Sequence, residues 1–167
     1  MAMIDAKSGH NATALSGEDW YLYFYQEIFY AFQLPYFSAL QQSVHLTPVP
    51  GSIDLVLGVM NVDDDILTVL DIPKAIGCSS SDLAALQLVI ITEVDGQKFG
   101  VPATHVVGKV KSSEFKLESN DMKTTRSSFV HQLACRENQP VTLLALDKIL
   151  QNQAEKEVLD ISQFLGP

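Results

Sequence analysis

The sequence has no long hydrophobic run. No apolar stretch approaches the ~18 residues that a membrane-spanning helix needs. The start of the chain, residues 1–19, is small and polar and lacks the basic and apolar segments of a signal peptide. These absences predict a flexible N-terminal tail and a cytoplasmic protein without direct membrane insertion.

Cysteines and clustered histidines are scarce. The two cysteines, Cys78 and Cys135, are too far apart for a Cys-x-x-Cys motif and too few for a disulfide framework. We therefore expect two free thiols. Four histidines occur, none paired at metal-ligand spacing, and we expect neither a metal nor a cofactor: His10, His45, His105 and His131.

Motifs for catalysis are also missing. The chain contains no Gly-x-Ser-x-Gly elbow, no Gly-x-Gly-x-x-Gly loop and no P-loop. Acid–base catalysis by carboxylates needs one carboxyl group in an apolar pocket, whereas the acids here fall in turns, helices and the tail. The sequence therefore predicts a protein that is not an enzyme.

Positive charge is in short supply. Eleven Lys and Arg oppose twenty Asp and Glu, which gives a net charge of −9. Proteins that bind nucleic acid normally present a basic face that displaces counterions from phosphate. We therefore expect no nucleic-acid partner, and partners that are basic or apolar.

What the chain does contain is a series of short, β-prone hydrophobic runs. Residues 20–34 carry most of the aromatic side chains and predict two core strands that turn at Gln26-Glu27. Residues 86–101 predict another hairpin, turning at Asp95-Gly96. Short helices are predicted after Pro35, over residues 102–106 as one alternative to a turn, and at 147–150, and residues 154–165 predict an amphipathic C-terminal helix.

The order of elements repeats. Phe32 lies 67 positions before Phe99 in similar return strands, and residues 56–76 align with 130–150 at a shift of 74. Two similar halves, about 20–78 and 86–152, are therefore expected to form two small barrels.

Residues 47–77 are the most informative stretch. Two apolar runs flank Asp63-Asp64-Asp65 and predict a hairpin with the aspartates at its solvated tip. A short helix follows, with Asp71 as its N-cap and Gly77 at its exit.

This stretch resembles the CheW-like family of adaptor modules in bacterial chemotaxis-type signalling. The matching segments are Val49-Pro50-Gly51, then Gly58-Val59-Met60-Asn61-Val62, then Val69-Leu70-Asp71-Ile72, in order and at the family's spacing. Asp63-Asp64 stand where the family usually has Arg-Gly, and Thr68 stands where proline is frequent. The resemblance extends from about Trp20 to Leu150.

The resemblance implies a mainly β fold with two five-stranded barrels of the OB or SH3 type packed together. The short helices and a C-terminal helix at 153–167, predicted above from the residue pattern, complete the expected fold. The resemblance also implies a stand-alone cytoplasmic adaptor, peripheral to receptor arrays, between a chemoreceptor's cytoplasmic tip and the regulatory domain of a CheA-type histidine kinase. A groove between the barrels would hold receptor helices. By the same resemblance the partner-binding residues are Gly58, Val59, Asn61, Val62, Asp63, Asp64 and Asp71.

Two questions remain open: the role of the three aspartates and the class of function. The three aspartates suit a solvated turn, a contact surface or a cation site, although the spacing of an EF-hand is absent. An OB-like barrel that binds a small ligand or an oligonucleotide is the second functional hypothesis, which the acidic charge disfavours.

Overall fold

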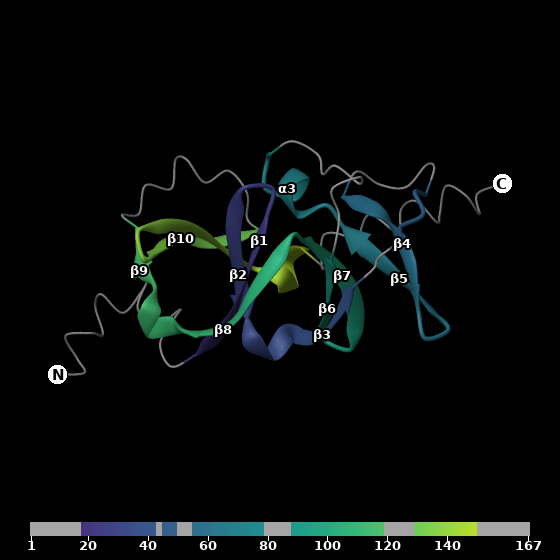
Figure 1. Ribbon diagram of the computed structural model, residues 1–167, viewed down its shortest axis with the longest axis horizontal. Helices are drawn as coiled ribbons and strands as arrows, with labels where there is room; N and C mark the ends of the chain where they lie inside the picture. Colours follow the sequence, from purple (N-terminus) through teal and green to yellow (C-terminus); the bar gives the residue numbers. More distant parts are fainter. Residues whose placement is uncertain (1–17, 43–44, 50–54, 79–87, 119–128, 150–167) are drawn as a thin grey trace.

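The computed structural model describes residues 18–42, 45–49, 55–78, 88–118 and 129–149. Its strands form two mostly antiparallel sheets that lie side by side, one in each half of Figure 1. The predicted N-terminal tail lies almost wholly outside the described residues, and the predicted C-terminal helix lies outside them entirely. The mainly β prediction is confirmed.

The first sheet has six strands and the second has five, and each orders its strands by pairing rather than by sequence. In spatial order the first contains β8 (His105–Lys111), β1 (Asp19–Tyr25), β2 (Ile28–Gln33), β11 (Gln139–Leu144), β10 (Val130–Arg136) and β9 (Lys116–Leu117). The second contains β3 (Phe37–Gln42), β6 (Leu88–Val94), β7 (Gln97–Ala103), β5 (Asp65–Leu70) and β4 (Val56–Val62). The short helices are η1 (Leu34–Tyr36), α3 (Ile72–Ala75) and η3 (Ser112–Glu114), with a further turn of helix at 146–149.

Each of the four tight hairpins among the described residues turns through two residues that both have positive φ. The central pairs are Gln26-Glu27, Asp63-Asp64, Asp95-Gly96 and Glu137-Asn138. This geometry matches the right-handed twist of the flanking strands. The hairpins predicted at 26–27, 63–65, 95–96 and 136–139 are confirmed, with Asp65 already in β5.

Both sheets curl into barrels. In the first, β8 and β9 lie at opposite edges but are joined by only residues 112–115. Five residue steps reach at most about 18 Å, whereas the edges of a flat six-stranded sheet lie about 24 Å apart. In the second, Thr47, just beyond β3, bridges to Val59 on the opposite edge strand β4.

The sheets differ from the contiguous halves expected from the sequence. The β1–β2 hairpin lies in the same sheet as the four strands from β8 through β11. The five strands from β3 through β7 form the other sheet. The exchange arises because β2 pairs in parallel with β11, and β5 pairs in parallel with β7. The boundaries 20–78 and 86–152 therefore delimit repeats along the chain, and each barrel takes strands from both repeats.

The repeat itself extends to the register of the strands. β4 and β5 match β10 and β11 at an offset of 74, and both hairpins have a bulge at the same place. β1 and β2 match β6 and β7 at an offset of 69, so the expected offset of 67 was two residues short. The bulge in β1–β8 is also reproduced in β3–β6. The corresponding strands of the two barrels therefore have their bulges, which bend and twist a strand locally, at matching places.

Three hydrophobic clusters follow from strand alternation. Trp20 and Leu22 point into the first barrel, and Val89 and Ile91 into the second. The residues that alternate with them pack in the largest cluster, between the sheets: Tyr21, Tyr23 and Tyr25 of β1, and Ile90 and Val94 of β6. The aromatic run at 20–34 is therefore core, as expected.

Two local predictions were wrong. The segment after Pro35 is strand β3, not a helix, because it pairs along β6. The predicted turn or helix at 102–106 spans the end of β7 and the start of β8, with Pro102 inside a strand.

Candidate partner-binding surface

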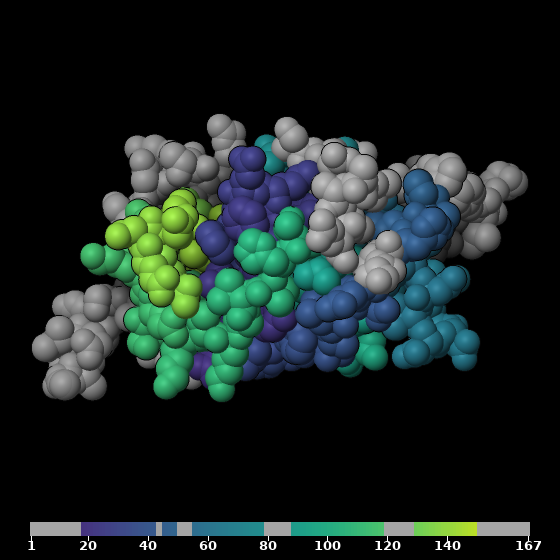
Figure 2. Space-filling view, in the orientation of Figure 1, coloured from purple at the N-terminus to yellow at the C-terminus, as the bar shows by residue number. Residues whose placement is uncertain are grey.

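The predicted partner-binding residues gather on one hairpin, with one exception. Gly58, Val59, Asn61 and Val62 lie on β4, and Asp63-Asp64 form the turn into β5. This hairpin lies at the far end of the second barrel, on the right of Figure 1. In Figure 2 the blue and teal atoms at the right-hand end belong to this part of the barrel.

Asp71 is the exception. Its side chain is only 3% exposed, and its carboxylate accepts a hydrogen bond from the backbone N–H of Lys74 at 3.3 Å. The predicted N-cap is therefore confirmed, whereas burial makes Asp71 unsuitable as a direct partner contact. Its role is to start helix α3.

Gly58 is also structural. A β-carbon there would lie 2.9 Å from the carbonyl oxygen of Thr47. Thr47 and Val59 exchange two backbone hydrogen bonds, each 2.9 Å long, at this point. The glycine therefore permits the close approach that joins the two edges of the second barrel.

The hairpin tip is acidic. Asp63 and Asp64, with φ of 49° and 71°, are exposed, and so is Asp65. Asp63 and Asp64 hold the left-handed backbone that aspartate tolerates better than most residues. Within the described parts of the chain, no ion pair involves any of the three carboxylates.

Beside this tip lies a hollow of about 370 Å³, near the lower end of the usual range for binding pockets. Ile66 borders it with 73% of its surface exposed, directly opposite Asn61 across the hairpin. The lining residues are Gln41, His45, Thr47, Val59, Met60, Asn61 and Ile66.

The sequence interpretation missed most of this lining. Ile66 begins the apolar run that follows the three aspartates, and such a run suggests a buried side chain. Its neighbour Leu67 and the next-but-one Val69 point inward, so alternation places Ile66 outside. That alternation was the available signal. Gln41, His45 and Thr47 have no local signal, since only barrel closure brings them to β4.

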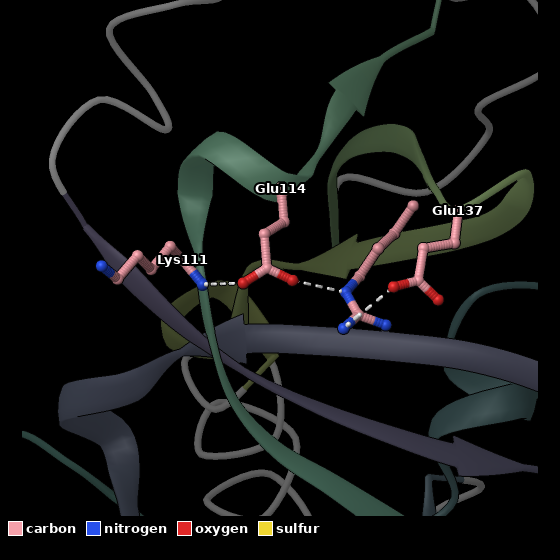
Figure 3. Close-up of polar contacts among 4 residues, drawn as sticks. Lys111, Glu114 and Glu137 are labelled. Atoms are coloured by element: carbon pink, nitrogen blue, oxygen red, sulfur yellow. Dashed lines mark hydrogen bonds and ion pairs between the residues drawn. The ribbon is translucent and has the colours of Figure 1, made fainter.

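The matching hairpin of the first barrel is held differently. Arg136, which corresponds to Val62, donates from Nε to Glu114 Oε1 at 2.9 Å and lies 3.7 Å from Glu137 Oε2 (Figure 3). Glu114 also accepts from the backbone N–H of Lys111 at 3.2 Å. The Arg136 hydrogen bond, followed by the Lys111 backbone hydrogen bond, lowers the pKa of Glu114.

Sites for chemistry are not found in the described residues. No three His, Cys, Asp or Glu side chains gather there as metal ligands would. His105 stacks on Phe24, and His131 packs at 6.1 Å from Trp20. Across the part of the chain that the structure describes, no helix has the length and apolarity to cross a bilayer.

The fold and the hairpin surface define a class of protein: a duplicated double β-barrel with exchanged strands and an exposed hollow of mixed polarity at one end. Comparison with known families then places it. The model of the CheW-like domain family matches residues 30–154, and the chain belongs to that family.

A solved structure agrees with this assignment. The chain is similar to the scaffolding protein TtCheW from Thermoanaerobacter tengcongensis, with 18% identity and a TM-score of 0.62. The similarity covers 77% of this chain and 88% of that chain. No curated protein matches the chain.

Proposed function

We propose that this protein is a non-catalytic adaptor that couples the cytoplasmic tip of a chemoreceptor to the regulatory domain of a CheA-type histidine kinase. The match to the CheW-like domain over residues 30–154 is the observation that carries the proposal. The adaptor is cytoplasmic and peripheral to receptor arrays, and it requires neither a cofactor nor a metal.

The mechanism is binding alone. An adaptor that contacts receptor and kinase passes on a preference between kinase states as a coupling free energy, typically ~1–3 kcal/mol. The exposed surface at the β4–β5 tip, with Val59, Asn61, Val62, Asp63 and Asp64, is the proposed partner contact. The acidic tip and the net charge of −9 favour basic or apolar partner surfaces.

The test is reconstitution from purified components. Kinase autophosphorylation is measured with receptor-containing membranes, with and without this protein, using the kinase and receptor identified by capture from the source cell. We expect receptor control of the kinase only when the protein is present. Control that is unchanged without it, or preferential binding of an oligonucleotide, would refute the proposal.

A further inference from the structure

Three aromatic rings form a row across the first sheet, near the β1–β2 turn at the top of Figure 1. Phe24 of β1 lies directly opposite Phe29 of β2 and also opposite His105 of β8. The ring centroids of Phe24 and Phe29 are 4.8 Å apart, and the His105 ring stacks on Phe24 at 4.9 Å. Phe24 and Phe29 are half-buried and His105 is exposed. This aromatic row therefore presents ring surface to solvent at one end of the barrel.

The second barrel carries charged side chains at the matching places. At the offset of 69, Phe24 corresponds to Glu93 and Phe29 to Lys98. Glu93 and Lys98 lie directly opposite each other across β6 and β7, and both are exposed. The fold therefore accommodates a solvated charged pair at this register. Barrel closure alone does not account for the aromatic row of the first barrel.

An acidic side chain lies in the turn beside the row. Glu27, three positions after Phe24 and two before Phe29, is exposed and forms no ion pair with a described residue. At the other end of the row, β8 is the edge strand of its sheet, so no further strand pairs beyond His105. Aromatic faces next to a carboxylate suit a guanidinium group, which stacks on rings and donates hydrogen bonds to a carboxylate.

We propose that an arginine side chain of a partner protein binds here, with its guanidinium plane against the aromatic row and its N–H groups directed to the Glu27 carboxylate. The net charge of −9 favours the approach of a basic group. The site lies on the first barrel, so it adds a second contact to the β4–β5 tip of the second barrel. The inference rests on the proposed adaptor function for the identity of the partner, which is the kinase or the receptor.

The probe is the peptide acetyl-Gly-Arg-Gly-amide, compared with its citrulline analogue, which keeps the planar end group but carries no charge. Each peptide is titrated into the ¹⁵N-labelled full chain. We expect the arginine peptide to shift the amides of Phe24, Phe29 and His105 and to bind about fivefold more tightly than the analogue, with weakening by salt. Equal binding of both peptides, or shifts no larger at the row than at Asp63-Asp64, would overturn the inference.

The second barrel supplies a matched variant. Phe24→Glu combined with Phe29→Lys transfers its charged pair to the first barrel without changing the net charge, and should weaken the arginine peptide at least about fivefold. Glu27→Gln, at an exposed turn position, leaves the rings in place and should weaken it about threefold. Asp95→Asn, in the turn of the equivalent hairpin β6–β7, should leave the affinity unchanged. An affinity that neither the double variant nor Glu27→Gln lowers would overturn the inference.

The purified kinase domain and receptor tip separate this inference from the proposed function. If they bind the wild type and the double variant equally, the adaptor function stands and the arginine site is wrong. If neither binds the wild type while the arginine peptide still shifts the row, the adaptor function is wrong and the arginine site stands. Dimerisation of the wild type that is lost in the double variant would identify a second copy as the occupant and overturn the assignment to a partner protein.

Discussion

Gly58 faces the carbonyl oxygen of Thr47 so closely that a β-carbon would lie 2.9 Å from it. The contacting atom is backbone and cannot swing aside as a flexible side chain can. Gly58→Ala should therefore open the Thr47–Val59 bridge and destabilise the protein by about 1–3 kcal/mol.

Hydrogen exchange and chemical unfolding test this expectation. The amides of Thr47 and Val59, which form the bridge, should exchange faster in Gly58→Ala. Gly96→Ala is the control, since it strains a turn with φ of 83° in open space. It should lower stability without faster exchange at the bridge. Unchanged exchange in Gly58→Ala would contradict the closure role.

The turn at Asp63-Asp64 offers a stabilising substitution. Asp64 has φ of 71°, a conformation that glycine adopts without a steric cost. Asp64→Gly should raise the free energy of unfolding by about 0.5–1 kcal/mol, and Asp64→Ala, which keeps the β-carbon but loses the polar side chain, should lower it. Urea denaturation of the three proteins measures the order, and a less stable glycine variant would show that the turn does not limit stability.

The hydroxyl groups of Tyr23 and Tyr30 are buried between the sheets without a hydrogen-bond partner among the described residues. Removing such a group relieves a desolvation cost. Tyr23→Phe should therefore leave stability unchanged or raise it, as measured by thermal unfolding. A loss above about 1 kcal/mol would show that the hydroxyl makes a favourable contact.

These tyrosines also predict sensitivity to alkali. Burial raises the pKa of Tyr23 well above its ordinary value of 10.0, with smaller contributions from Tyr30 and Tyr25, and burial likewise raises that of Tyr30. The unfolded chain releases these protons near pH 10 while the folded chain retains them. The contribution of these tyrosines to stability should therefore be constant below this pH and fall above it. The fall should be smaller in Tyr23→Phe.

The ion pair of Glu114 with Arg136 predicts a weak effect at acidic pH. Because the pKa of Glu114 is lowered from 4.5 in the folded state, its stabilising contribution is present above that pH and is lost as the pH falls. Glu114→Gln should cost well under about 1 kcal/mol at pH 7, since the pair is exposed. Unfolding curves measured at both pH values test this: the difference in stability between wild type and variant at pH 7 should disappear at pH 3.

The charge at Asp63 should decide partner choice. The family usually carries arginine at this place, and an arginine can bind a receptor carboxylate through two hydrogen bonds. Asp63 would repel a receptor carboxylate. We therefore expect the cognate receptor to offer Lys or Arg instead. Asp63→Arg should weaken cognate binding and strengthen binding to a receptor from an arginine-bearing system. No change in either affinity would identify the turn as a solvated tip without a role in recognition.

The hairpins were predictable because their signals are local. Asp95-Gly96 between two apolar runs specifies a tight turn, and the runs around Asp63-Asp64 do the same. Sequence order also revealed the repeat. It missed β3, because residues 37–42 lack clear alternation and form a strand only by pairing along β6.

The exchange of strands between barrels had no local signal. The sequences of β2 and β11 do not indicate that these strands pair in parallel. The pairing depends on the packing of Tyr23, Tyr30 and their neighbours between the sheets. The hollow depends on the same closure. Of the expected contact residues, Val59 and Asn61 line it, whereas Gly58 and Asp71 proved structural.

The exchange has a consequence for how such a chain can be assembled. A polypeptide with only one repeat would hold a hairpin, a crossing strand and a second hairpin that belong to different barrels. It could complete both barrels only with a second identical molecule, as an intertwined pair. In the duplicated chain the covalent link between β5 and β6 replaces that encounter, so assembly becomes independent of protein concentration.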